Sequence, residues 1–331
     1  MSTAASAPTN STLNTLEVPE VGDGVGCGGG SRLEMNPACV GLSRVVVRSA
    51  VGPVTAFAGR RSGGHALILL HGAAAGWSTW TPLLAASDLT ERPLTDVIAV
   101  DMPGWGESGT RMPSVPRLSE AIVEVVRSLG YERWGIVGHS LGGVIALDIA
   151  ARHPVETLAV GLVSPSGEGV RAVTRHPVRS AARLPGFAGM LLAMRLLRLL
   201  GRATPPLLAG LRTTGALRLL TAPLFRHPSR VDRSVSEALA TEIRPAAFVR
   251  AARAARTYDD GRWRRIRGPV RSVSGAHDVF SPVSDDAWFA RRVPDFAAVR
   301  LPGAGHFAAI ERPFEVLAAF ATVIRALKDA A

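Results

Sequence analysis

Short, uninterrupted apolar runs recur along the chain and alternate with longer segments of helical periodicity. Runs that are apolar at every position are typical of strands buried on both faces of a parallel sheet. The strands predicted in this way are 45–47, 54–57, 66–70, 97–100, 134–137, 158–163, 270–273 and 299–301. The helices predicted among them are 118–129, 141–152 and 313–327. This alternation predicts a doubly wound α/β fold with a mostly parallel sheet, in which the first two strands form a hairpin around Gly52 and Pro53.

Residues 168–265 interrupt this alternation. Their helical pieces, at 188–200, 235–242 and 246–255, are separated by prolines, and no strand-like run occurs among them. We therefore predict a core formed by residues 43–167 and 266–331, with a helical cap, residues 168–265, inserted over the carboxyl ends of the strands. Residues 1–40 are rich in Ser, Thr, Gly, Pro and Asn, which predicts a flexible N-terminal tail.

Positive charge is concentrated in the cap. Residues 168–265 contain nineteen arginines, no lysine and six acidic residues, so their net charge of +13 exceeds the +11 of the whole chain. Three interpretations remain open. The arginines are a solvated surface around a hydrophobic pocket, which we favour; or helix 190–202 is a basic amphipathic helix that contacts anionic lipid; or arginines bind an anionic group of the substrate. Nucleic-acid binding is not predicted, because the basic residues alternate with leucine and no nucleic-acid module occurs.

Other sequence features bear on the localisation of the protein and on its need for disulfides, metals or cofactors. The most apolar stretch, 187–200, is interrupted by Arg195 and Arg198, so no membrane span is predicted. The N-terminus lacks the basic and apolar regions of a signal peptide, and the only cysteines are Cys27 and Cys39. We therefore expect a cytoplasmic protein without a disulfide scaffold. No His/Cys cluster suggests a metal, and no cofactor is predicted.

The segment Gly138-His139-Ser140-Leu141-Gly142 matches G-x-S-x-G and lies between a predicted strand and a predicted helix. A sharp strand–turn–helix exposes the hydroxyl of Ser140 in a strained backbone conformation, and side chains at Gly138 and Gly142 would collide across the turn. These features predict a nucleophile elbow with Ser140 as the nucleophile. A glycine-rich turn capped by a serine is the simpler alternative.

A nucleophilic serine needs a base and an orienting carboxylate. His306 follows the last predicted strand in Leu-Pro-Gly-Ala-Gly-His, and Asp278 follows the strand before it in Gly-Ala-His-Asp. We predict His306 as the base and Asp278 as its partner, against the alternatives of an exposed loop histidine and a turn-capping aspartate. The backbone N–H groups of Ala73 and Leu141 are the predicted oxyanion hole, and His71 is expected to shape its loop rather than to transfer protons.

Five segments in order resemble the α/β-hydrolase superfamily over about residues 43–331. They are HG at 71–72, DMPGWGES at 101–108, GHSLGG at 138–143, GAHD at 275–278 and GAGH at 303–306. The resemblance implies the α/β-hydrolase fold, a structural role for Asp101 and a cap over the active site. The tail has no counterpart in it. Epoxide hydrolases and haloalkane dehalogenases of this superfamily use an aspartate nucleophile, so Ser140 argues against them.

These residues together predict a serine hydrolase that forms an acyl-enzyme on Ser140 and cleaves a small, hydrophobic, ester-type substrate, such as an ester, thioester or lactone. Carbon–carbon bond hydrolysis and acyl transfer to an acceptor other than water would use the same residues. A ligand-binding protein without catalysis is the alternative from another class. The sequence predicts no oligomeric state.

Overall fold

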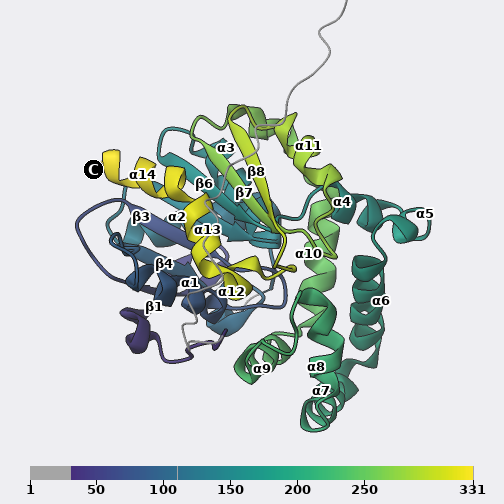
Figure 1. Ribbon diagram of the computed structural model, residues 1–331. Helices are drawn as coiled ribbons and strands as arrows, with labels where there is room; N and C mark the ends of the chain where they lie inside the picture. Colours follow the sequence, from purple (N-terminus) through teal and green to yellow (C-terminus); the bar gives the residue numbers. More distant parts are fainter. Residues whose placement is uncertain (1–30, 110, 331) are drawn as a thin grey trace, which may run out of the picture.

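The computed structural model describes residues 31–109 and 111–330; Cys27 and residues 1–30 of the predicted tail lie outside the described residues. An eight-stranded sheet with the order β1-β2-β4-β3-β5-β6-β7-β8 forms the centre of the molecule (Figure 1). Its strands are β1 (Leu42–Ser49), β2 (Gly52–Gly59), β3 (Ala66–Leu70), β4 (Val97–Val100), β5 (Trp134–His139), β6 (Thr157–Val163), β7 (Val270–Gly275) and β8 (Phe296–Leu301). The pairs β1–β2 and β2–β4 are antiparallel, and all other pairs are parallel, as predicted.

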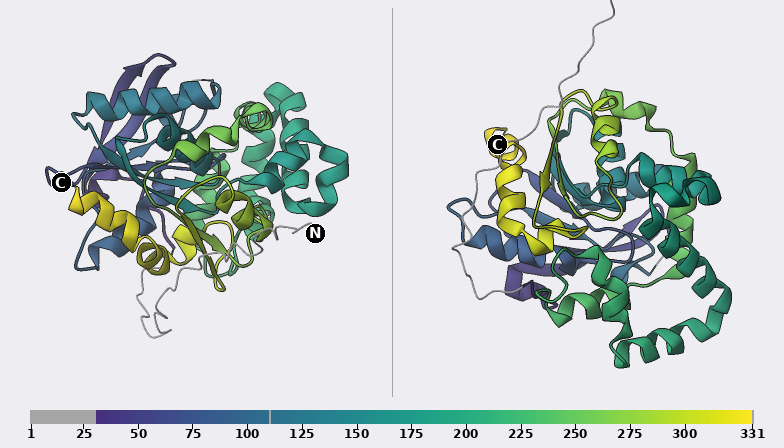
Figure 2. Two further views of the ribbon diagram at one scale, coloured as in Figure 1. Left: turned by 90° about the horizontal axis from the view of Figure 1, so that it is seen from above. Right: turned by 45° about the vertical axis from the view of Figure 1, so that its right-hand side comes forward.

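Helices cover both faces of the sheet (Figure 2). The strand β3 shows why its sequence is apolar throughout: Ala66, Ile68 and Leu70 pack into one hydrophobic layer, and Leu67 and Leu69 pack into the opposite one. The first layer includes α2 (Val115–Ser128), α3 (Leu141–Arg152) and α11 (Ser284–Ala290). The second includes α1 (Thr81–Asp88), α12 (Ala308–Glu311), α13 (Pro313–Ala319) and α14 (Ala321–Asp329).

The segment between β6 and β7 is helical, and it extends from one side of the sheet (Figure 1). We call residues 168–265 the cap. Its α-helices are α4 (Glu168–Arg175), α5 (Pro177–Ser180), α6 (Pro185–Leu200), α7 (Thr204–Thr213), α8 (Ala216–Thr221), α9 (Arg233–Thr241) and α10 (Pro245–Thr257). Its 3₁₀ helices are η4 (Ala181–Arg183), η5 (Gly201–Ala203), η6 (Ala222–Leu224) and η7 (Asp260–Arg265). Those of the remaining chain are η1 (Pro37–Val40), η2 (Trp77–Trp80) and η3 (Gly106–Ser108).

The last part of the predicted cap packs on the core. Trp263 of η7 is 1% exposed and stacks on Phe289 of α11, with ring centroids 5.8 Å apart. The indole of Trp263 donates to the Tyr258 hydroxyl, which in turn donates to Asp148 of α3 at 2.8 Å. This buried chain of hydrogen bonds fixes the C-terminal end of the cap on α3.

Two predictions were wrong by more than a small shift of the end of an element. The helix expected over 313–327 is divided into α13 and α14 at Phe320, whose buried ring fills the space above Gly161. Residues 31–40, which we assigned to the flexible tail, pack on the folded chain. Leu33 is 2% exposed among cap residues, and its N–H donates to the Ser234 hydroxyl at 2.9 Å. The N–H of Glu34 donates to the Thr81 hydroxyl of the core at 3.0 Å, so this segment bridges cap and core.

Candidate active site

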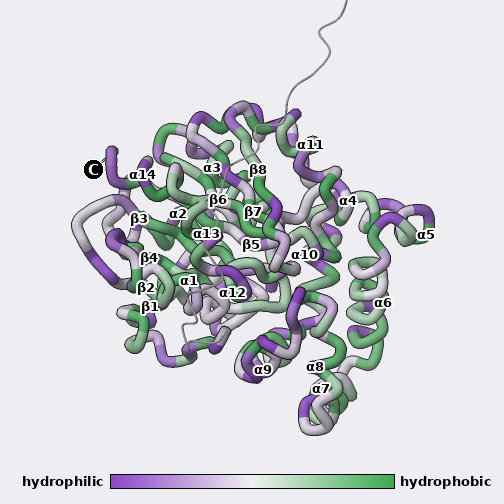
Figure 3. The backbone as a smooth tube through the Cα atoms, in the orientation of Figure 1, coloured by the Kyte–Doolittle hydropathy of each residue, from purple (hydrophilic) through white to green (hydrophobic). Residues whose placement is uncertain are grey.

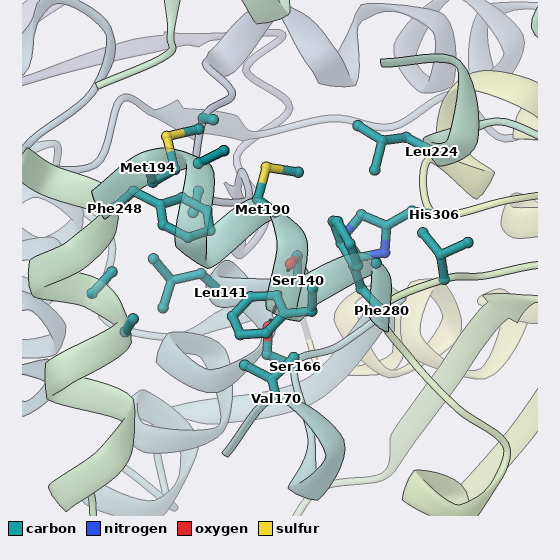
Figure 4. Close-up of a pocket in the computed structure, with 18 of the residues that line it drawn as sticks. Ser140, Leu141, Ser166, Val170, Met190, Met194, Leu224, Phe248, Phe280 and His306 are labelled. Atoms are coloured by element: carbon teal, nitrogen blue, oxygen red, sulfur yellow. Dashed lines mark hydrogen bonds between the residues drawn. The ribbon is translucent and has the colours of Figure 1, made fainter. Parts of the chain in front are cut away.

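The predicted elbow lies where β5 ends and α3 begins. Ser140 is between them with φ 52° and ψ −112°, a region that a residue with a Cβ atom adopts only under strain. Its backbone is held there because its N–H donates to the Val163 carbonyl at 3.0 Å and its own carbonyl accepts from Ser166 and Gly143. The hydroxyl of Ser140 points into a cavity (Figure 4).

The glycines of the elbow are required by close backbone contacts. A Cβ at Gly138 would lie 2.4 Å from the Gly142 carbonyl oxygen, which is the predicted collision across the turn. A Cβ at Gly142 would instead lie 2.2 Å from the carbonyl oxygen of Leu70, at the end of the neighbouring strand β3. The second glycine therefore lets α3 approach the loop that follows β3, which the sequence alone did not indicate.

His306 and Asp278 come together although they are 28 residues apart. The loops after β7 and β8 bring Asp278 Oδ1 and Oδ2 to 2.9 and 3.1 Å from His306 Nδ1. The imidazole is 4% exposed and lies edge-on to the ring of Phe280. Because a carboxylate only accepts hydrogen bonds, Nδ1 carries a proton and Nε2 is left to act as an acceptor.

The surroundings of Asp278 favour its ionised form. Burial by itself opposes ionisation, but the charge and hydrogen bond of His306 outweigh it. The N–H groups of Phe280 and Ser281 donate to Oδ1 at 2.8 and 3.0 Å and add to this effect. Together these contacts lower the pKa of the Asp278 carboxyl. A carboxylate that stays ionised beside an imidazole stabilises the protonated ring.

His139, which we did not single out from the sequence, contacts His306 directly. Its Nε2 donates to the His306 carbonyl at 3.0 Å, and the two rings are 4.8 Å apart. Burial, followed by the neighbouring charge of His306, lowers the pKa of His139 to about 3, so this side chain is neutral at pH 7. A neutral donor at this point fixes the backbone of the loop that carries His306. Its place inside G-x-S-x-G, immediately before the serine, was the available sequence signal.

Ser166 is a second residue that sequence reasoning missed. It follows β6, and its Oγ lies 3.4 Å from Ser140 Oγ (Figure 4). Ala73 and Leu141, the predicted oxyanion-hole residues, line the same cavity as Ser140 and His306. Leu141 is the first residue of α3, where backbone N–H groups have no acceptor within the helix.

The cavity has a volume of about 660 Å³ and lies between the strand ends and the cap. Its wall on the cap side is mostly apolar and includes Met190, Met194, Phe248 and Leu224 (Figure 4). One arginine, Arg171, is among the described residues that line the cavity. Its guanidinium pairs with Asp260 at 2.7 Å. Asp260 is shared with Arg292, so Arg171 has a carboxylate partner within the protein, and the mostly apolar lining suits an apolar molecule.

Two polar residues near the site make structural contacts, as predicted. His71 Nδ1 donates to the Gly72 carbonyl at 2.7 Å, and Nε2 accepts from Met102 N–H at 2.9 Å. Burial lowers the pKa of His71, so the neutral side chain stabilises its loop through these two hydrogen bonds. Asp101 accepts from the N–H groups of Trp77 and Glu107, each at 2.9 Å, and thereby fixes two loops.

Comparison with known proteins identifies the family of this chain. The model of the alpha/beta hydrolase family matches residues 67–320. A pimeloyl-[acyl-carrier protein] methyl ester esterase of Aromatoleum aromaticum is 30% identical over 78% of this chain and 98% of its own length. The dihydrolipoyllysine-residue acetyltransferase component of the acetoin cleaving system of Pseudomonas putida is 28% identical over 77% of this chain and 62% of its own.

A solved structure of a hydrolase from Pseudomonas aeruginosa superposes with a TM-score of 0.65 at 20% identity, covering 85% of this chain and 98% of that one. The chain belongs to the alpha/beta hydrolase family. The predicted fold class and the predicted enzyme class, a hydrolase, are confirmed.

Proposed function

We propose that the protein is a serine hydrolase that cleaves a carboxylic ester with a hydrophobic acyl chain. The observation that carries the proposal is that a strained serine and a carboxylate-bound histidine, Ser140 and His306, line one apolar cavity. The hydrophobic ester is favoured over an anionic substrate because the lining is mostly apolar and Arg171 already contacts Asp260.

In the proposed mechanism, His306 Nε2 takes the proton of Ser140 as Oγ attacks the ester carbonyl. The negative charge on the carbonyl oxygen is received by the N–H groups of Ala73 and Leu141. His306 then protonates the leaving alcohol and afterwards activates a water that releases the acid. Asp278 keeps the imidazole in the required tautomer and stabilises its charged form during both steps.

The role of Ser166 differs from that of Ser140. Its hydroxyl is close enough to Ser140 Oγ to donate a hydrogen bond to it, and among the described residues Ser140 is the side chain that it contacts in this way. We assign Ser166 to orienting Ser140 before attack. The serine in the elbow is the nucleophile because only its position combines the strained turn with the first N–H groups of α3.

The test is hydrolysis of p-nitrophenyl esters from acetyl to palmitoyl by the wild type, Ser140→Ala and Ser166→Ala. Burying each CH₂ contributes about 0.8 kcal/mol, so kcat/KM rises by up to about fourfold per methylene until the cavity is full. Ser140→Ala is expected to abolish turnover, whereas Ser166→Ala retains it. Absence of turnover by the wild type on every ester would overturn the ester assignment. If a fluorophosphonate still labelled the protein, carbon–carbon bond hydrolysis would be the next reaction to test.

A further inference from the structure

The outer surface of the cap is apolar where a water-exposed surface is normally polar. Among the described residues, most of the exposed large hydrophobic side chains lie on α5 to α8 rather than on the core. We call the following seven residues the leucine patch: Leu192, Leu196, Leu199 and Leu200 on α6, Leu207 on α7, and Leu219 and Leu220 on α8. Hydrophobic colouring extends along α6 and α8 at this end of the molecule (Figure 3).

The helix α6 is apolar on two opposite faces. Phe187, Leu191 and Met194 are buried in the cap. Leu192, Leu196 and Leu199 follow one another at spacings of four and three residues, so they share the face turned away from these buried residues. A helix that presents leucine to the interior and to the outside is typical of an element covered on its second face by another apolar phase.

The arginines around the leucine patch indicate what covers it. Between Glu168 and Asp232 the sequence has eleven arginines and no acidic residue. Arg195 and Arg198 of α6, Arg202, and Arg212 and Arg218 on α7 and α8 are exposed, and within the described parts of the chain none of them pairs with a carboxylate. Leucines among unpaired arginines match the interface of an anionic bilayer, where acyl chains lie beneath phosphates. A second copy of this surface would meet it with the same sign of charge.

The cavity opens within the same surface. Leu196 and Leu220 line the cavity and are nevertheless 53% and 65% exposed, so they form part of its rim. Leu211 and Leu217, which also line it, belong to α7 and α8. No helix among the described residues is long and apolar enough to cross a membrane. Contact through the leucine patch would therefore be made on the membrane surface, with the rim of the cavity against the lipid.

We propose that the helices α6 to α8 dock the protein on the surface of an anionic phospholipid bilayer. The leucine patch enters the boundary between headgroups and acyl chains, and the surrounding arginines bind the phosphates. Docking places the mouth of the cavity where an apolar molecule can pass from the bilayer toward Ser140 without crossing water. The binding itself does not depend on the proposed ester hydrolysis.

The test is co-sedimentation of the full chain with vesicles of phosphatidylcholine alone and of phosphatidylcholine mixed with phosphatidylglycerol, each at low and high salt. The wild type is expected to bind the mixed vesicles at least about tenfold more tightly than the neutral ones, and high salt should remove most of that difference. Ser140→Ala should bind like the wild type, which separates this result from the outcome of the esterase assay. No binding to mixed vesicles at low salt would overturn the proposal.

Matched variants distinguish the leucine patch from charge alone. Leu199→Glu with Leu219→Glu changes two patch residues that do not line the cavity, and it should weaken binding to mixed vesicles by about tenfold or more. Leu89→Glu with Val155→Glu introduces the same two charges at core positions that are 69% and 63% exposed, and this control should bind like the wild type. Thermal melting checks that each variant is folded. If the patch variant binds mixed vesicles as well as the control variant does, the proposed apolar docking surface is wrong.

Discussion

The elbow and the cap differ in how closely the backbone is packed. In the elbow, a Cβ at Gly138 or Gly142 would lie within 2.4 Å of a carbonyl oxygen. In the cap, a Cβ at Gly189 or Gly210 would meet no atom within 4 Å. The proposed nucleophile is therefore held by contacts that allow few substitutions, whereas these positions of the cap, which forms the outer wall of the cavity, have space for a larger side chain.

The largest expected effect is on kcat, and it follows from a substitution in the core. Asp278→Asn is expected to lower kcat on a p-nitrophenyl ester by about 10⁴-fold, because the amide no longer fixes the reactive tautomer of His306. Steady-state kinetics measures the loss. The control is Asp285→Asn, a buried aspartate on α11 that lies outside the cavity lining, which should retain kcat within about twofold. Equal losses in both variants would show that the Asp278 effect is only structural.

The contact between the core and the cap is expected to depend on pH. Asp285 of α11 accepts from the Gly169 N–H of α4 at 3.0 Å. Burial raises the pKa of Asp285 to about 7, although the Gly169 N–H and the charge of Arg300 oppose it. The folded protein therefore prefers the protonated acid, whose contribution to stability is present below the unfolded pKa of 3.8 and is lost as the pH rises toward 7.

Asp285→Asn tests whether protonation of Asp285 stabilises the folded protein, because the amide stays neutral at every pH. The free energy of unfolding of the wild type should fall relative to that of the variant, by up to about 4 kcal/mol, between about pH 4 and pH 7. Urea denaturation at several pH values measures both curves. Parallel curves for the two proteins across this interval would contradict the raised pKa.

Glycine substitutions compare the two regions directly. Gly142→Ala forces a Cβ against the Leu70 carbonyl and is expected to lower the free energy of unfolding by about 1–3 kcal/mol and to disturb the elbow. Gly189→Ala, inside α6, has free space and should stabilise the protein by about 0.5–1 kcal/mol. Urea denaturation of both variants gives the two values. The comparison fails if the two substitutions change stability in the same direction by similar amounts.

The smallest expected effect concerns the length of the substrate. Leu211→Trp adds volume to the cavity wall on α7 and is expected to lower kcat/KM for a long-chain ester by about tenfold while leaving the acetyl ester nearly unchanged. Leu207→Trp is the control, because Leu207 lies on the same helix but does not line the cavity. A uniform loss on all chain lengths would place Leu211 away from the acyl-binding wall.

The sequence predicted the core well for a physical reason. Strands buried on both faces must be apolar at every position, so β3 and β4 were predicted at their observed bounds. The elbow and the loops after β7 and β8 carry a hydroxyl, a carboxylate and an imidazole beside glycines, and such local signals singled out Ser140, Asp278 and His306 as candidates. The structure brings Asp278 and His306 into hydrogen-bond contact.

The features that were missed depend on long-range packing. Neither the 3.4 Å approach of Ser166 to Ser140 nor the bond from His139 to the His306 carbonyl follows from spacing, because each joins segments that only the sheet brings together. The short helices α7 and α8 lack a clear periodicity, since leucines occur on both of their faces. Leucine on both faces of a helix obscures the helical pattern in the sequence, and in the structure it produces the exposed leucine patch.

The most direct test of the account is the site at which a fluorophosphonate modifies the protein, determined by mass spectrometry of the digested adduct. The account predicts one phosphonylated peptide, modified at Ser140, and much slower labelling in His306→Ala because the base has been removed. Labelling at Ser166, or labelling of Ser140 at the same rate without His306, would contradict the proposal that Ser140 is the nucleophile activated by His306.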